Sequence, residues 1–178
     1  MGITILIFFL LYALDQASKL ATELFLHKDE MVTLIPHVLD VTKVYNTGAA
    51  WSLFEEHTWI LVLISALATI VLAILASKND WRHAKLQGFS ITMALAGCVG
   101  NFFDRLVSII PKTAVARPGV VDMISFKPFD WLCNALHLGT TVFNVADMYL
   151  VIGLIIYAID LIFFQERRSL KYAENNSI

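Results

Sequence analysis

Charged residues are scarce in this chain of 178 residues: they make up 16% of it, whereas about 25% is usual for soluble domains. Hydrophobic residues make up 58% of the sequence, which argues against a water-soluble globule. The 13 basic and 15 acidic residues give a formal net charge of −2, so no surplus of positive charge is available for nucleic acid. The composition therefore excludes a nucleic-acid-binding protein and favours a membrane protein.

Cysteine and the common catalytic motifs are also nearly missing. Cys98 and Cys133 are too few for a disulfide framework, and Cys98 lies in an apolar run, which favours buried thiols over redox chemistry. The five histidines are scattered, and neither His-Glu-x-x-His nor Gly-x-Ser-x-Gly occurs. The sequence therefore predicts neither a catalytic zinc ion nor a serine nucleophile.

Long apolar runs are what the sequence does contain. Residues 58–77 form a run of 20 without a charge and residues 86–103 a run of 18, lengths that approach the ~30 Å thickness of a bilayer at ~1.5 Å per residue. The first apolar run continues past Asp15 and Lys19 to Leu26, and it lacks a basic leader and a cleavage site, so we expect a retained anchor. We predict a helical membrane protein with one domain over residues 1–178, with spans at about 3–24, 58–77, 86–106 and 143–164.

Basic residues indicate how these spans are oriented. Three of them lie in the eight-residue linker 78–85, and the tail adds Arg167, Arg168 and Lys171 close to the last span. Because cytoplasmic segments carry an excess of Lys and Arg, both regions and both termini are predicted to be cytoplasmic. In the first outer segment, the β-branched residues 31–45, interrupted by Pro36, predict two short strands of a small sheet. The second, residues 107–140, contains several Pro and Gly residues and is interpreted as irregular loop.

Polar residues gather at the predicted outward ends of the spans. Ionisable groups in a membrane are costly, so each is a candidate functional residue, although ion pairs and helix caps where the chain leaves the lipid remain the alternative. Asp122 and Asp147 could meet there, share one proton and hold a water molecule as an aspartic protease does. Spacing alone leaves open whether they do this or are simply solvated or capping residues. The gathered residues are Asp15, Lys19, Asn46, Asn101, Asp104, Arg105, Asp122, Asn144 and Asp147.

Five motifs, read in order, resemble the lipoprotein signal peptidase family, also called signal peptidase II. They span about residues 10 to 160 of the chain. The resemblance implies four spans with cytoplasmic termini in the bacterial inner membrane, and an active site facing the extracytoplasmic side. The motifs are Asp15-Gln16-Ala17-Ser18-Lys19, Asn46-Thr47-Gly48-Ala49-Ala50-Trp51, Gly97-Cys98-Val99-Gly100-Asn101-Phe102-Phe103-Asp104-Arg105, Val120-Val121-Asp122 and Phe143-Asn144-Val145-Ala146-Asp147.

The same resemblance implies an aspartic endopeptidase that removes signal peptides from prolipoproteins, cutting before the diacylglyceryl cysteine of the lipobox. It makes Asp122 and Asp147 the catalytic dyad. It further implies inhibition by globomycin, contact with membrane lipid, no metal or organic cofactor, and action as a monomer. Residues expected to bind substrate or support the dyad are Asn46, Gly48, Asn101, Arg105, Asn144, Asp15 and Lys19. Asp130, in the outer loop, and Asp160, at the cytoplasmic end of the last span, are expected to be dispensable for cleavage.

The chain departs from the family in its outer loops. Sixteen residues separate Arg105 from Asp122 and 24 separate Asp122 from Asp147, both more than is usual. Residues 108–118 are interpreted as a mobile flap over the dyad. Trp51 and Phe54 would contact either the lipid interface or the acyl chains of the substrate.

Two other functions are weighed against the protease. A proton or ion carrier would need polar residues through the whole membrane thickness, and residues 58–77 and 88–100 provide only a few hydroxyl groups. A structural assembly subunit is the second rival. Cleavage of a lipid-modified precursor by the purified protein would distinguish it from an enzyme.

Overall fold

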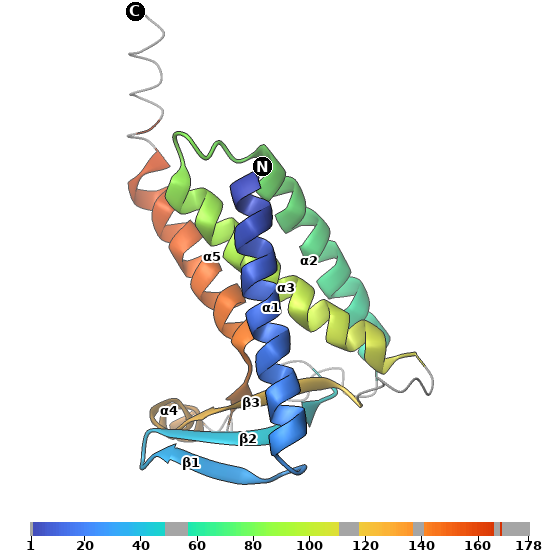
Figure 1. The fold of residues 1–178 in the computed structure, drawn as a ribbon. Helices are drawn as coiled ribbons and strands as arrows, with labels where there is room; N and C mark the ends of the chain where they lie inside the picture. Colours follow the sequence, from blue (N-terminus) through green and yellow to red (C-terminus); the bar gives the residue numbers. More distant parts are fainter. Residues whose placement is uncertain (1, 49–56, 111–117, 137–140, 166–167, 169–178) are drawn as a thin grey trace, which may run out of the picture.

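The structure is a computed structural model, and it describes residues 2–48, 57–110, 118–136, 141–165 and 168. Within these residues, four helices are long and apolar enough to cross a membrane: α1 (Gly2–Phe25), α2 (Thr58–Lys78), α3 (Lys85–Ser108) and α5 (Val145–Phe163). They form a bundle, and a small sheet lies at one end of it (Figure 1). The prediction of a helical membrane protein with four spans and a small sheet is confirmed.

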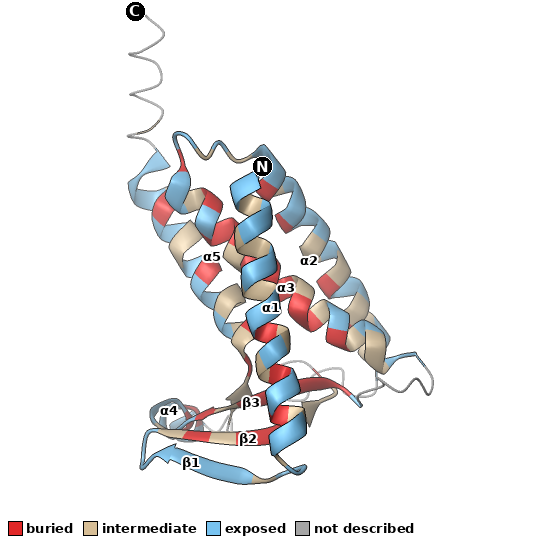
Figure 2. Ribbon diagram, in the orientation of Figure 1, coloured by how far each residue is buried: buried red, intermediate tan, exposed pale blue. Residues whose placement is uncertain are grey.

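Helix α3 forms the centre of the bundle. Within its most apolar stretch 56% of the residues are buried, against 11–22% in the other three long helices, in which most large apolar residues are exposed (Figure 2). An apolar surface of this extent is expected where the surroundings are lipid rather than water. A Cβ atom on Gly153 would lie 2.7 Å from Ala94 N, and one on Gly97 would collide with the Ala146 carbonyl. Glycine at these two positions therefore lets α3 and α5 approach closely.

The sheet has four antiparallel strands in the order β1 (Met31–Ile35), β2 (Leu39–Asn46), β3 (Val120–Phe126) and β4 (Val142–Phe143). The two strands expected within residues 31–45 are β1 and β2, joined by a tight turn in which His37 has a φ of 60°. Strand β3 pairs with β2 so that Asn46 lies opposite Val120 and Val44 opposite Asp122. This register brings residues that are 74 and 78 positions apart in the sequence to the same end of the bundle.

The expectation of irregular loop over residues 107–140 is wrong for two parts of that segment. Residues 120–126 form β3, because Val120, Val121 and Ile124 are β-branched and favour an extended backbone that β2 can pair with. Residues 127–135 form a short helix, α4 (Lys127–Ala135), with Pro128 in its first turn. Proline is tolerated there because the first helical N–H groups have no partner within the helix. The flap proposed for residues 108–118 lies mostly outside the described residues.

Candidate active site

Asp122 lies on β3 and is almost completely buried, with 2% of its surface exposed. Both of its carboxylate oxygens accept a hydrogen bond from a side-chain amide. Asn46 Nδ2 donates to Asp122 Oδ2 over 2.9 Å, and Asn144 Nδ2 donates to Asp122 Oδ1 over 2.6 Å. The Gly48 N–H donates to Asn46 Oδ1, which fixes the direction in which the Asn46 amide points. The carboxylate is therefore held in one orientation.

Asp147 is the third residue of α5 and belongs to a capping box. The Asn144 N–H donates to Asp147 Oδ2 over 3.0 Å, and the Asp147 N–H donates to Asn144 Oδ1 over 2.9 Å. Such a reciprocal pair satisfies backbone donors that a helix N-terminus otherwise leaves unpaired. The other carboxylate oxygen, Asp147 Oδ1, accepts a hydrogen bond from Asn101 Nδ2 of α3 at 2.7 Å. Local sequence and the central helix together fix this second carboxylate.

Asn144 links the two carboxylates. It is completely buried, and its Nδ2 donates both to Asp122 Oδ1 and to Asn101 Oδ1, the latter over 3.1 Å. Since its Oδ1 accepts the Asp147 N–H, all three polar functions of the amide are in use. Strand β3, helix α3 and helix α5 therefore meet through a single side chain.

The environment of Asp122 changes its protonation. Burial raises its pKa from the ordinary value of 3.8 to about 7, and the nearby charge of Asp147 acts in the same direction, against the amides of Asn46 and Asn144. Burial and a like charge both disfavour the ionised form of a carboxyl. Asp122 therefore gains and loses a proton near neutral pH, which suits a group that exchanges protons with a substrate.

A buried ionic cluster supports this pair from inside the bundle. Lys19 Nζ lies 2.9 Å from Asp15 Oδ2 and 2.6 Å from Asp104 Oδ2, and it donates to Asn101 Oδ1 over 3.3 Å. Asp15 Oδ1 accepts the N–H of Ala146, in the first turn of α5. The pairing of Asp15 with Lys19 is therefore more than a surface ion pair, because it holds both Asn101 and the helix end that carries Asp147.

Not every sequence-predicted residue is brought to the carboxylate pair. Among the described residues no hydrogen bond or ion pair joins the Arg105 side chain to Asp122 or Asp147, and Arg105 Nε has no hydrogen-bond partner there. Trp51 and Phe54 lie outside the described residues. Sequence reasoning left the role of Asp104 open, and it missed the contact of Asp15 with the α5 backbone. The capping box could have been read from the pattern of Asn followed by Asp three residues later.

Asp130 and Asp160, which are expected to be dispensable for cleavage, have hydrogen-bond partners of their own away from the carboxylate pair. The Asp130 carboxylate is buried and accepts bonds from Ser125 Oγ, at 3.0 Å, and from the N–H of Thr141, at 2.8 Å. Asp160 is buried at the opposite end of the bundle and accepts two bonds of 2.6 Å from the guanidinium of Arg168. Both carboxylates therefore have a structural task away from the pair.

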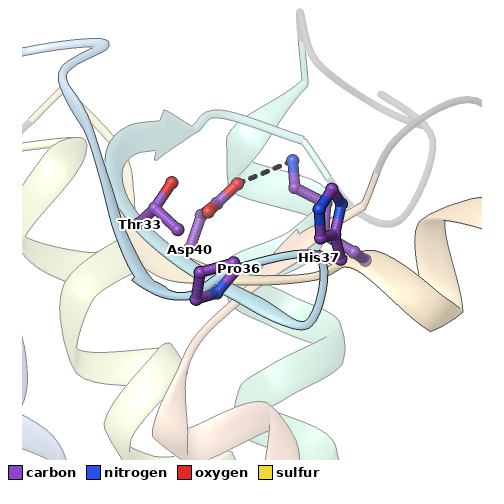
Figure 3. Close-up of a pocket in the computed structure, with 5 residues that line it drawn as sticks. Thr33, Pro36, His37 and Asp40 are labelled. Atoms are coloured by element: carbon purple, nitrogen blue, oxygen red, sulfur yellow. Dashed lines mark ion pairs between the residues drawn. The ribbon is translucent and has the colours of Figure 1, made fainter.

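A pocket lies on the sheet, and neither Asp122 nor Asp147 lines it (Figure 3). Thr33, Pro36 and His37 line it together with an ion pair of 2.7 Å between Asp40 and Lys127. The hydrogen bond from Lys127 holds the pKa of Asp40 below its ordinary value, so this carboxylate stays ionised and is a poor proton donor at neutral pH. No group of three His, Cys, Asp or Glu side chains within the described part of the chain could hold a metal ion.

Comparison with known proteins adds independent information. The family model described as signal peptidase (SPase) II matches residues 7–163. The lipoprotein signal peptidase of Fusobacterium nucleatum is 29% identical over 95% of this chain and 92% of its own, and that of Enterococcus faecalis is 34% identical over 86% and 83%. A solved bacterial membrane enzyme is similar with a TM-score of 0.73 and 27% identity, over 93% of this chain and 96% of its own. The match to the family model includes every residue of the carboxylate pair and of the ionic cluster.

Proposed function

The chain belongs to the signal peptidase II family, and from this premise we propose that it removes signal peptides from prolipoproteins with Asp122 and Asp147 as its catalytic pair. The protein is a multi-pass membrane peptidase. The observation that carries the aspartic mechanism is the pair of carboxylates joined through Asn144, one of them with a pKa near 7.

In the proposed mechanism the two carboxylates take different tasks. Protonated Asp122 donates a hydrogen bond to the scissile carbonyl oxygen, while ionised Asp147 removes a proton from the attacking water. The water oxygen bonds to the carbonyl carbon as the carbonyl oxygen receives the Asp122 proton. When the carbon–nitrogen bond breaks, the proton held by Asp147 passes to the leaving amine, and one hydroxyl proton of the intermediate returns to Asp122 as the new carboxyl group forms. Arg105 enters this proposal through the family resemblance alone.

The place of the pair in the bundle suits a substrate that is itself a membrane helix. Asp147 is the third residue of α5, so the pair lies where a span ends. We place this end on the extracytoplasmic side of the bacterial inner membrane, because the basic linker 78–85 and Arg168 lie at the other end. Cleavage would occur before the diacylglyceryl cysteine. The proposal also includes a single protease domain over residues 1–178, action as a monomer without a cofactor, and inhibition by globomycin-type compounds.

An ion carrier is a weaker proposal, because the described polar groups do not form a path across the bundle. Ser65 Oγ and Thr92 Oγ1 donate to carbonyl groups of their own helices, at Leu61 and Gly88. Asp160 is thirteen residues after Asp147 on α5, about 20 Å at ~1.5 Å per residue. That distance is too long for direct proton transfer.

Single-turnover cleavage of a lipid-modified precursor in detergent tests the proposal. Asp122→Asn and Asp147→Asn should each lower the rate by several orders of magnitude, and the double variant should lose little more, because the two groups act as a unit. Asp29→Asn is the matched control: Asp29 is exposed and has a φ of 61°, a conformation that Asn tolerates. Near-normal cleavage by folded Asp147→Asn would refute the pair, and equal cleavage with and without globomycin would refute the inhibitor assignment.

Cysteine labelling tests the orientation. In a background without Cys98 and Cys133, a membrane-impermeant thiol reagent added outside intact cells should label Asp29→Cys, between α1 and the sheet, and leave Asn79→Cys unlabelled. Efficient labelling of the variant at Asn79 from outside would reverse the proposed orientation.

A further inference from the structure

Helix α4 presents an apolar face that nothing in the described chain covers. Phe129, Leu132 and Leu136 follow one another at helical spacing and are 44–59% exposed. Trp131 is 74% exposed and lies about 100° around the helix axis from Leu132, at the edge of this face. The buried residues of the helix are Asp130 and Cys133, which face the sheet. The usual arrangement of a surface helix is therefore inverted, since its apolar side is turned away from the protein. Figure 2 shows α4 as largely exposed at the sheet end of the bundle.

The buried carboxylate of Asp130 fixes the direction of this face. It accepts a hydrogen bond from Ser125 Oγ of β3 and two from Thr141, one from its N–H at 2.8 Å and one from its hydroxyl at 3.3 Å. A buried charge that lost these partners would be strongly disfavoured. Helix α4 therefore cannot turn its apolar side toward the sheet without exposing unpaired groups.

The same hydrogen bonds place α4 close to the membrane border. Helix α5 has 19 residues, about 28 Å at ~1.5 Å per residue, so it spans the ~30 Å hydrocarbon layer with Val145 at the border. Thr141 is four residues before Val145 and can lie at most about 14 Å from it. A helix with side chains has a radius of about 5 Å, and each headgroup layer is about 6 Å thick. The apolar face of α4 is therefore within reach of the lipid interface.

We infer that α4 is an interfacial helix whose exposed face, formed by Phe129, Leu132 and Leu136 with Trp131 at its edge, inserts into the lipid leaflet at the sheet end of the bundle. Met148 and Val151 of α5, near the same end of the bundle, are also exposed and apolar. A tryptophan beside Phe and Leu is typical of side chains that sit at a membrane interface. Because β3 carries Asp122 and runs directly into α4, the docked helix sets the height of that carboxylate relative to the lipid.

Spin labels on the full chain in liposomes test this inference without a cleavage assay. The measurement is the ratio of two collision rates of a nitroxide label, with oxygen, which concentrates in lipid, and with a water-soluble nickel complex. In a background without Cys98 and Cys133, this ratio should be several-fold higher for a label at Leu132→Cys than for a label at Asn134→Cys. Asn134 is the matched control because it is exposed on the same helix, about 160° around the axis from Leu132 at 100° per residue. Equal ratios at the two positions would overturn the inference.

Other occupants would give different signals. If the label at Leu132→Cys were shielded from both reagents, a protein partner would cover the face. If its spectrum showed dipolar broadening, a second copy of this chain would cover it. Either result overturns the inference. A second measurement keeps the native cysteines. Lipids brominated near the headgroup should quench the wild-type fluorescence more than that of Trp131→Phe, and equal quenching of the two proteins would contradict docking on lipid.

Discussion

Replacing Asp122 by Asn should abolish cleavage and yet stabilise the folded protein at alkaline pH. The pKa of Asp122 is about 7 in the folded state against 3.8 ordinarily, a difference of about 3 pH units that corresponds to about 4 kcal/mol. The folded state binds the extra proton between these two values, so the stability of the wild type falls as the pH rises from 3.8 through 7. An uncharged Asn has no such penalty.

The substitution also has a cost. The amides of Asn46 and Asn144 both donate to Asp122, whereas Asn offers only one oxygen acceptor, so one donor would face another donor. Leaving a buried donor unsatisfied costs about 1–3 kcal/mol. Because this cost does not depend on pH, the stability of Asp122→Asn relative to the wild type should rise by about 2–3 kcal/mol between pH 5 and pH 8.

Unfolding by denaturant in mixed detergent micelles, followed by tryptophan fluorescence at pH 5 to 8, measures this difference. Asp40→Asn, in the same sheet, is the matched control. Lys127 lowers the pKa of Asp40, so the ionised Asp40 carboxylate makes its full contribution to stability at every pH above 3.8. The free energy of unfolding of Asp40→Asn relative to the wild type should therefore stay constant from pH 5 to pH 8. A difference for Asp122→Asn that is equally flat would refute the reasoning.

Further predictions concern the packing and the buried charges. Gly153→Leu should force α5 away from the α3 backbone, 2.7 Å from a Cβ atom there, and should lower the unfolding midpoint. Asp130→Ala should destabilise the protein by about 1–3 kcal/mol and speed hydrogen exchange in α4, whereas the near-isosteric Asp130→Asn should do so much less. Arg168→Gln should cost about 3 kcal/mol in denaturant unfolding by leaving Asp160 unpaired, and adding Asp160→Asn should restore most of it. Cleavage by the wild type should decline as the pH rises through about 7, because Asp122 then loses its proton, and a rate–pH profile checks this.

The four long helices could be predicted from the sequence because the signal is local. A span must satisfy its backbone hydrogen bonds internally and face lipid with apolar side chains, so a mainly apolar run of the right length with few charges is sufficient evidence. The strand at residues 120–126 could not be recognised with the same ease. Its partner, β2, ends 74 residues before it begins, and Pro118 and Pro128 on either side favoured a loop interpretation.

The candidate site shows the same division between local and distant information. Helical periodicity on α3 and the polar residues at span ends indicated that Asn101, Asn144 and Asp147 would lie near one another. Periodicity does not determine how one helix is rotated against the next. The choice of Asp104 as a second partner of Lys19 and the bond from Asp15 to the backbone of α5 therefore required the packed bundle.

The ionic cluster around Lys19 has a consequence for how the chain is made. Asp15 and Lys19 are one helical turn apart on the first span, so they can neutralise each other as soon as that span leaves the ribosome. Asp104 and the α5 backbone are synthesised 85 and 127 residues after Lys19. Until both have entered the bilayer, Asn101 and Asp147 cannot be held in place. A nascent chain is therefore unable to attack its own first span or neighbouring precursors before its last helix is inserted, and the enzyme should become competent in one step at the end of translation.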